Sequence, residues 1–406
     1  MEKKIPTLSP PSILWLQVSG LAAMQGAISL TWIIYRVYLP ELLKQFGFPG
    51  LDKTIQIVED GFAVVVEPLM GGLSDQTRRW IGTRFPFIAV GVILSSGLFI
   101  AIPAVVIFGN PSGVLRWVLP VVLVAWALAM AVFRSPAVAL LGQYAAVPEL
   151  PQAFSLLILV GGLVGAIRPL ASGLILSLGP GFTFTIGAIA LLAAAAVLRA
   201  VNPQATINPL PAESTITEQK LSIPSLALIL GLGASIGWGF RLLILDVFPK
   251  VVAAELGLDM AAINGLISIG LAIFSLFAGA IAVRVGNQLV MLTGIATTIV
   301  LSILLGLIHG AIAVTLVAIA LLACFSLVWN GTVPLALSLL PPAKGGLAVG
   351  IYFGGFSAAM SLFSLVMSPQ TTIAPIGGVL IAAIAFLIAG LCILSSSNNK
   401  IRPTFQ

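Results

Sequence analysis

The chain has 406 residues, of which 59% are hydrophobic and 8% are charged, and its mean hydropathy is +1.15. Soluble globular domains carry about 25% charged residues, so the composition excludes a soluble globule and indicates a polytopic membrane protein. A spanning helix needs about 20 apolar residues, so the length accommodates about twelve helices with short connections. The net charge of +6 is then a signal of membrane topology and not of nucleic-acid binding.

Apolar runs predict an all-α polytopic membrane protein with twelve transmembrane helices arranged as two six-helix pseudo-repeats. The start of the chain lacks a cleavable signal sequence, so we expect the first helix to act as an uncleaved anchor. The expected helices span residues 12–38, 53–74, 85–108, 116–141, 151–177, 182–200, 223–248, 259–283, 288–308, 311–338, 346–368 and 374–394.

The distribution of Lys and Arg predicts that both termini are cytoplasmic, in a cell inner membrane. With the N-terminus inside, eleven basic residues fall in cytoplasmic segments and four in outer loops, in agreement with the positive-inside rule. The eleven are Lys3, Lys4, Arg78, Arg79, Arg84, Arg199, Lys220, Arg284, Lys344, Lys400 and Arg402, and the four are Lys44, Lys53, Arg116 and Lys250.

The long polar stretch at 201–222 divides the chain into an N-terminal bundle (1–200) and a C-terminal bundle (223–406), joined by a cytoplasmic linker. An internal repeat supports this division. Pro148 is followed at the same spacing by Gly161-Gly162 as Pro341 is by Gly354-Gly355. Two repeats of six helices suit alternating access about a central site.

The chain is organised around the segment 67–87, EPLMGGLSDQTRRWIGTRFPF. We expect an apolar helix to end in Gly71-Gly72 and a new one to start at 85–87, with a charged tip between them. Two glycines allow another backbone to approach closely. Asp75 is expected to cap and form a salt bridge at the membrane boundary. Arg78, Arg79 and Arg84 would lie near the anionic cytoplasmic leaflet, so the segment is interpreted as a cytoplasmic gating loop.

This segment resembles the loop signature of the major facilitator superfamily, G-x-x-x-D followed by basic residues. The longer pattern, SDQTR at 74–78 and GTRFPF at 82–87, resembles glycoside-pentoside-hexuronide symporters and their proton-coupled sucrose-transporter relatives. The segment FRSPAVALL at 133–141 resembles helix 4 of the same families. The resemblance implies a secondary transporter of a small organic solute, which a glycoside would fit, coupled to protons or sodium.

Eight charged residues fall within or at the ends of the expected helices: Arg36, Glu59, Asp60, Glu67, Arg134, Arg168, Arg241 and Asp246. Each costs about 2.5–3.5 kcal/mol at a helix centre, so each should face a partner, water or substrate. With a rise of about 1.5 Å per residue, Glu67 and Arg134 lie at similar depth, and we predict that they touch. Glu59 and Asp60 are expected at the depth of Arg168.

The resembled symporters place cation-binding acids on helix 2, which makes Asp60, Glu67 and Glu59 the candidates for cation coupling. Desolvation favours the neutral carboxyl, which can then carry a proton. The alternative is that these acids only neutralise Arg134 and Arg168.

The candidate substrate-binding residues are Gln25, Arg134, Arg168, Trp238, Arg241, Trp329 and Asn330. Arginines can hold a carboxylate bidentately, and aromatic rings beside amide groups can stack on a sugar. The alternatives are bundle salt bridges, a pair between Arg241 and Asp246, and packing of the aromatic rings. Arg36 and Asp246 are expected at the outer interface. Trp32 and Tyr35 are either cavity residues or interfacial anchors.

No motif indicates an enzyme, a cofactor or a metal site. The expected partners are a small-molecule substrate, a proton or sodium ion and the lipid bilayer, and no nucleic acid. Two other functions are compatible with the same scaffold. One is export of amphipathic compounds, which the very apolar second half favours. The other is a non-transporting assembly or pigment-delivery role.

Overall fold

The computed structural model describes residues 12–109, 112–202, 222–367 and 374–398, and within these ranges the chain is almost entirely helical. The helices are α1 (Trp15–Gln45), α2 (Leu51–Ile81), α3 (Phe85–Phe108), η1 (Gly113–Trp117), α4 (Val118–Val138), α5 (Leu141–Tyr144), η2 (Val147–Glu149), α6 (Leu150–Gly165), α7 (Ile167–Ser177), α8 (Pro180–Val201), α9 (Ile223–Gly239), η4 (Phe240–Val247), α10 (Phe248–Leu256), α11 (Met260–Val285), α12 (Asn287–Leu305), α13 (Ala311–Leu339), η5 (Pro342–Lys344), α14 (Gly345–Val366) and α15 (Pro375–Asn398).

In the described part of the chain, eleven helical segments are long and apolar enough to cross a membrane. The long helix α2, which carries more charge, lies beside them and completes the expected twelve-helix fold. The chain is therefore an integral membrane protein. The residues between α8 and α9 that were expected to form the linker, 203–221, lie outside the described ranges, as do Lys3, Lys4, Lys220, Lys400 and Arg402.

Three expected helices differ from the structure, one in its end and two in their continuity. Helix α2 does not end at Gly71-Gly72 but continues to Ile81, and it stops at Gly82, whose positive φ of 82° suits a glycine C-terminal cap. The expected helix 151–177 is broken into α6 and α7, with Ala171 at a non-helical φ of −135°. The expected helix 223–248 contains a π-helical segment, η4, between α9 and α10.

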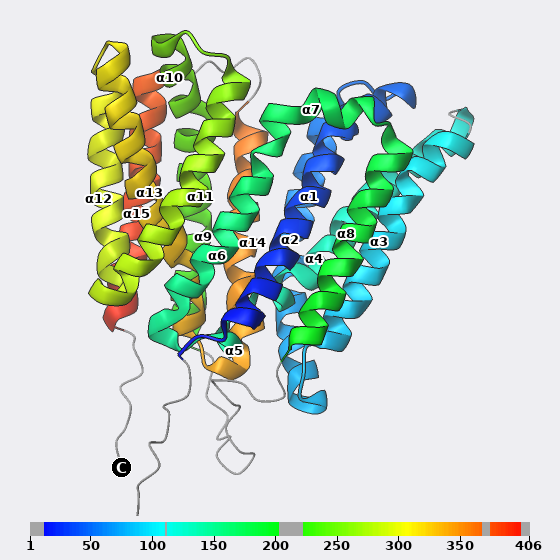
Figure 1. Cartoon of the computed structure of the whole chain (residues 1–406), viewed down its shortest axis with the longest axis horizontal. Helices are drawn as coiled ribbons and strands as arrows, with labels where there is room; N and C mark the ends of the chain where they lie inside the picture. Colours follow the sequence, from blue (N-terminus) through cyan, green and yellow to red (C-terminus); the bar gives the residue numbers. More distant parts are fainter. Residues whose placement is uncertain (1–11, 110–111, 203–221, 368–373, 399–406) are drawn as a thin grey trace, which may run out of the picture.

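The helices pack as two groups (Figure 1). Helices α1–α8 form the N-terminal group and α9–α15 form the C-terminal group, although α2 and α6 have their most extensive contacts with the other group. The groups meet chiefly where α2 packs on α14 and α6 packs on α11. In Figure 1, α12 and α15 lie at the left edge and α3 and α8 at the right, with α6 and α14 between them. A site between the groups would therefore be bordered by α2, α6, α11 and α14.

Glycines allow the backbones of α2 and α14 to approach closely. A Cβ on Gly71 would collide with the carbonyl oxygen of Gly346, and a Cβ on Gly350 would collide with that of Glu67. Small residues at such crossings let helices pack in lipid, where no hydrophobic force holds them together. A Cβ on Gly72 would lie 3.7 Å from the Leu347 side chain, an ordinary contact. The expected close approach is thus confirmed at Gly71 and wrong at Gly72.

Candidate functional site

Glu67 on α2 forms an ion pair with Arg134 on α4, as predicted from their depths. The side-chain oxygen and nitrogen are 2.6 Å apart, and Glu67 has no solvent exposure. The hydroxyl of Ser135 also donates a hydrogen bond to this carboxylate. The Arg134 guanidinium lies 4.5 Å from the centre of the Phe353 ring, on α14 of the other group. The buried charge of Glu67 is therefore compensated within the N-terminal group, next to the boundary between the groups.

Glu59, about two turns before Glu67 on α2, has a different partner from the expected one. It pairs with Arg36 of α1 at 3.0 Å and accepts a hydrogen bond from the Tyr35 hydroxyl. Its expected neighbour in depth, Arg168, forms no ion pair among the described residues. Arg36, which was expected at the outer interface, has a side chain that is 18% exposed and points to Glu59. Depth alone could not decide between two arginines on different helices.

Asp60 is half-buried and, within the described ranges, has no ion-pair partner. It lines a cavity of about 40 Å³ between the groups, together with Trp32, Glu59, Ala63, Glu67, Ala127, Met130, Ala131, Arg134 and Ser357. A buried water needs about 10–15 Å³ of such space, so the cavity has room for about three waters. Organic ligands occupy sites of about 300–1,000 Å³, so binding of a solute here requires the groups to separate.

The aromatic residues of α1 lie inside the N-terminal group and not at the membrane interface. Tyr35 has no solvent exposure, and its ring lies 4.4 Å from that of Trp126. Trp32 packs edge-on against the same ring at 4.9 Å. The indole nitrogen of Trp32 is buried without a hydrogen-bond partner. Because Trp32 lines the cavity, this N–H is a donor available to water or to a solute.

The other candidate substrate residues lie outside this cavity. Gln25 packs beside Gly161 of α6, and Arg168 is exposed on α7. Arg241 covers the face of the Phe363 ring at 4.5 Å, and Trp238 packs edge-on against that ring. The alternative pair between Arg241 and Asp246 is absent from the described structure, since Asp246 pairs with Lys250 at 2.7 Å.

Trp329 and Asn330 do not form one face. Trp329 stacks on Phe240 at 4.8 Å within the C-terminal group. Asn330 is 1% exposed and donates to the carbonyl oxygen of Pro151 at 2.9 Å, which ties the two groups together. Consecutive residues of an α-helix point about 100° apart, so Trp329 and Asn330 contact different neighbours.

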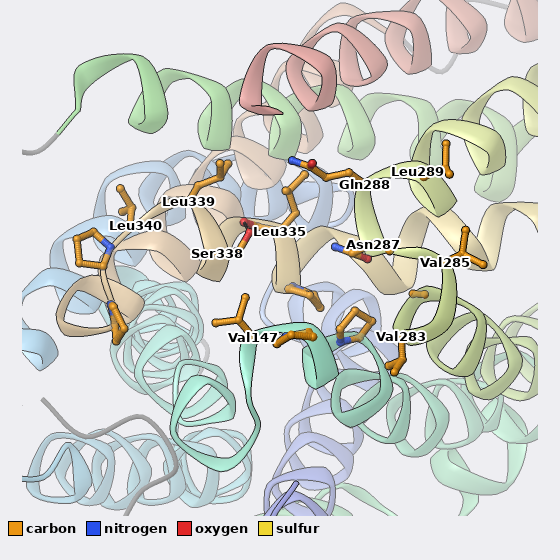
Figure 2. Close-up of a pocket in the computed structure, with 17 residues that line it drawn as sticks. Val147, Val283, Val285, Asn287, Gln288, Leu289, Leu335, Ser338, Leu339 and Leu340 are labelled. Atoms are coloured by element: carbon orange, nitrogen blue, oxygen red, sulfur yellow. Dashed lines mark hydrogen bonds between the residues drawn. The ribbon is translucent and has the colours of Figure 1, made fainter. Parts of the chain in front are cut away.

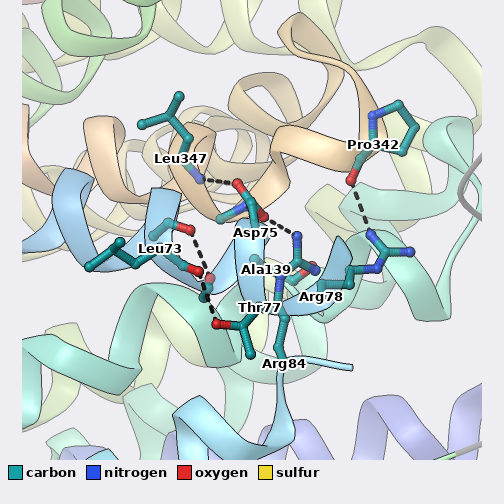
Figure 3. Close-up of polar contacts among 11 residues, drawn as sticks. Leu73, Asp75, Thr77, Arg78, Arg84, Ala139, Pro342 and Leu347 are labelled. Atoms are coloured by element: carbon teal, nitrogen blue, oxygen red, sulfur yellow. Dashed lines mark hydrogen bonds and ion pairs between the residues drawn. The ribbon is translucent and has the colours of Figure 1, made fainter. Parts of the chain in front are cut away.

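Asp75 joins the N-terminal group to the start of α14 (Figure 3). Its carboxylate forms an ion pair with Arg84 and accepts from the backbone N–H groups of Gly346 and Leu347 at 2.9 and 2.8 Å. The first N–H groups of a helix have no partner within the helix, and the residue before α14, Lys344, provides no side-chain cap. Asp75 supplies that cap from another helix, with its negative charge at the positive end of the helix dipole. We call these contacts the latch.

Arg78 strengthens the latch by donating to the carbonyl oxygen of Pro342 at 3.1 Å (Figure 3). The expected capping and salt bridging by Asp75 is confirmed, and Arg84 is as buried as Asp75. Arg79, grouped with these residues from the sequence, is exposed and has no ion-pair partner in the described part of the chain. The gating segment is thus divided between Arg78 and Arg84, which contact other elements, and Arg79, which faces outward.

A larger hollow of about 760 Å³ lies at the same end of the bundle as the latch, between the groups (Figure 2). Its walls are the segments 147–151, 282–289 and 334–342, and most of its side chains are apolar. Two of its polar residues already have partners: Asn287 donates to Gly331 O and Gln288 donates to Ser396. None of the candidate substrate or coupling residues lines it.

Sequence reasoning missed Ser135 and Ser357 of the central site. It named Tyr35 as a cavity residue or an anchor but missed its bond to Glu59. Tyr35 and Ser135 each donate to an acid of α2, and Ser357 lines the cavity from α14. Ser135 follows Arg134 directly in the sequence, so the predicted contact between Arg134 and Glu67 could have indicated that Ser135 also lies near Glu67. Nothing in the sequence marks Ser357, because a serine inside an apolar helix most often bonds its own backbone.

The chain belongs to the Major Facilitator Superfamily, whose family profile matches residues 21–364. This family membership indicates a transporter and not an enzyme. No curated protein matches the sequence. Among the solved structures that share the fold, three illustrate it, all at less than 20% identity.

A bacterial homologue of the iron transporter ferroportin in an outward-facing state has a TM-score of 0.71 and 18% identity, over 94% of this chain and 99% of that one. The E. coli fucose:proton symporter has a TM-score of 0.66 and 13% identity, over 95% and 99%. The human organic anion transporter MFSD10 has a TM-score of 0.63 and 14% identity, over 97% and 98%. Such likeness concerns the fold alone.

Proposed function

We propose that this protein is a cation-coupled secondary transporter that moves a small organic solute by alternating access. The observation that carries the proposal is Asp60, a half-buried carboxyl without an ion-pair partner in the described structure, at the wall of a cavity between the two helix groups. A carboxyl in such a place can take up and release a cation as the cavity changes its contact with water. Glu59 and Glu67 already have partners, so Asp60 is the leading coupling residue.

The division into bundles 1–200 and 223–406, joined by the linker 201–222, is part of this proposal. Two groups that meet along α2–α14 and α6–α11 can rock about a central site. The latch would hold them together at one end. The positive-inside count assigns that end, with both termini, to the cytoplasm of a cell inner membrane. The 760 Å³ hollow would then lie on the cytoplasmic path of the solute.

The class of solute is less narrowly defined than the mechanism. The resemblance to glycoside symporters favours a sugar derivative, and one structural neighbour is a fucose:proton symporter. Other neighbours are an iron transporter homologue and an organic anion transporter. In the proposal, Trp32 and Arg134 bind the solute from the N-terminal group after the groups separate, and Trp238 and Arg241 bind it from the other. Gln25, Trp329 and Asn330 remain candidates with weaker positional support, and Arg168 is a candidate on α7, outside the central cavity.

The experiment is uptake of labelled glycosides and organic acids into proteoliposomes, with and without an inward proton or sodium gradient. The proposal expects one solute to accumulate above its outside concentration only with a gradient. Protein-free liposomes and a collapsed gradient are the controls. If no gradient produces accumulation of any solute, the coupled-transport proposal fails. Extrusion of amphipathic dyes from the proteoliposomes would then favour the exporter. Absence of both solute uptake and dye extrusion would favour the assembly role.

A further inference from the structure

Ion pairing leaves part of the charge in the transmembrane region without a partner. In the described ranges, five of its eight charged residues form three ion pairs: Arg36–Glu59, Arg134–Glu67 and Lys250–Asp246, the last with a residue outside the eight. Asp60, Arg168 and Arg241 have no ion-pair partner among the described residues. Two cations and one acid therefore remain, and the cations exceed the acids even when Asp60 is ionised.

The two unpaired arginines occupy matching depths on opposite groups. Arg168 follows the start of α6 at Leu150 by as many residues as Arg241 follows the start of α9 at Ile223. At 1.5 Å per residue both lie about 27 Å from the latch end of the bundle, towards its opposite end. Phe363, whose ring Arg241 covers, is equally far along α14 from Gly345. Both arginines thus lie beyond the central cavity on the side away from the latch.

Both arginines also lie where a helix is interrupted. Arg168 falls between the end of α6 at Gly165 and the non-helical Ala171. Arg241 lies in the π-helical segment η4. Interrupted helices line substrate sites in secondary transporters, and single π-helical turns recur at functional sites. Two different helices are thus interrupted where they carry an arginine that has no ion-pair partner among the described residues.

The surroundings leave both guanidinium groups available to a ligand. Phe363 covers the flat face of Arg241, and a guanidinium stacked in this way can still use its N–H edge for bidentate hydrogen bonding. Arg168 is exposed, and its helix α7 contacts α1, which carries Arg36. Arg36 acts on Arg168 as a like charge. The positive charge of Arg36 makes the Arg168 guanidinium less stable, so binding of an anion beside Arg168 is more favourable.

We propose that Arg168 and Arg241 form a two-sided site for the anionic group of the transported solute, so that the substrate is an organic anion and not a neutral glycoside. The inference rests on the proposed transport function and specifies its substrate class. Each group contributes one arginine, so an anion bound between them would be held by both groups at once. Planar N–H pairs suit a carboxylate.

Binding of matched solutes to the full chain in phosphatidylcholine nanodiscs tests the site without requiring transport. The probes are gluconate with sorbitol, succinate with 1,4-butanediol, and benzoate with benzyl alcohol. The readouts are the shift in unfolding temperature and tryptophan fluorescence. We expect at least one anion, and not its neutral partner, to bind. Arg168→Gln and Arg241→Gln should each weaken this binding by about 10- to 100-fold, as expected for loss of a charged hydrogen bond.

Arg116→Gln is the matched control, since Arg116 is exposed in η1 and covers Phe48. It should leave anion binding unchanged, which separates a local site from the net charge. The two glutamine variants should also keep the wild-type unfolding temperature. If either arginine had a structural role, its replacement would lower that temperature. Equal binding of anions and neutral partners, or anion binding that survives in the double variant, would overturn the site.

Further results separate the substrate site from a lipid-headgroup site, and the anion site from the transport function. If phosphatidylglycerol nanodiscs abolish binding of the free anion, the arginines hold a lipid headgroup and the substrate site is refuted. Gradient-driven accumulation of a neutral solute without anion binding would refute the anion site and leave the transport function standing. Anion binding without any gradient-driven accumulation would refute the transport function and leave the anion site standing.

Discussion

Replacing Arg134 by glutamine tests how the buried charge of Glu67 is held. Among the described residues, Arg134 is the one ion-pair partner of Glu67, whose exposure is zero. After the substitution the carboxylate keeps only the hydrogen bond from Ser135. Breaking a buried pair by removing one partner costs about 3–5 kcal/mol, because the remaining charge is buried and uncompensated.

The reverse substitution, Glu67→Gln, should cost less. The Arg134 side chain is 25% exposed and lies over Phe353, so its charge can find water when the carboxylate is gone. The expected loss is about 1.5–3 kcal/mol, typical of a hydrogen bond to a charged group. The double variant leaves neither charge, and we therefore expect the two effects to be non-additive by about 2–3 kcal/mol.

Equilibrium unfolding by SDS in mixed micelles, followed by circular dichroism, measures the free energies of the four proteins in this cycle. Arg168→Gln combined with Glu67→Gln is the control, since these two residues form no ion pair. That pair should add within about 0.5 kcal/mol. Additive single effects for Arg134 and Glu67, or a larger loss for Glu67→Gln than for Arg134→Gln, would refute the reasoning.

Two substitutions probe the packing of α2. Gly71→Ala forces a Cβ against the backbone of Gly346 and should lower the unfolding free energy by about 1–3 kcal/mol. Gly72→Ala should be neutral or stabilising by up to about 1 kcal/mol, because alanine favours the helix. Equal losses of stability for the two variants in thermal unfolding would contradict this contrast. Tyr35→Phe removes the hydroxyl bonded to Glu59 and should cost about 1–3 kcal/mol, and an unchanged unfolding temperature would show that the bond contributes nothing.

The helices and one buried pair could be predicted because they depend on quantities that the sequence carries. Apolar length identified the spans, and helix rise placed Glu67 and Arg134 at one depth. The partner of Glu59 could not be predicted, because depth does not show which helices are neighbours. Arg36 on α1 and Arg168 on α7 were both compatible with it, and packing selected Arg36.

The latch was only half predictable. The pattern around Asp75 indicated a charged boundary and its salt bridge, which the structure shows with Arg84. The sequence did not show that Asp75 caps α14, since that contact joins residues 271 positions apart. The continuation of α2 through Gly71-Gly72 was missed for a related reason. Glycine disfavours a helix locally by about 1 kcal/mol, and the packing of α14 against that surface outweighs it.

The central claim is that Asp60 couples solute movement to a cation gradient, and one measurement tests it most directly. For a solute that wild type accumulates, Asp60→Asn should be compared in gradient-driven uptake and in counterflow exchange, where no net cation movement is needed. The account predicts that the variant loses accumulation but keeps exchange, with the same unfolding temperature as wild type. If Asp60→Asn still accumulates the solute to the wild-type level, Asp60 does not carry the coupling cation.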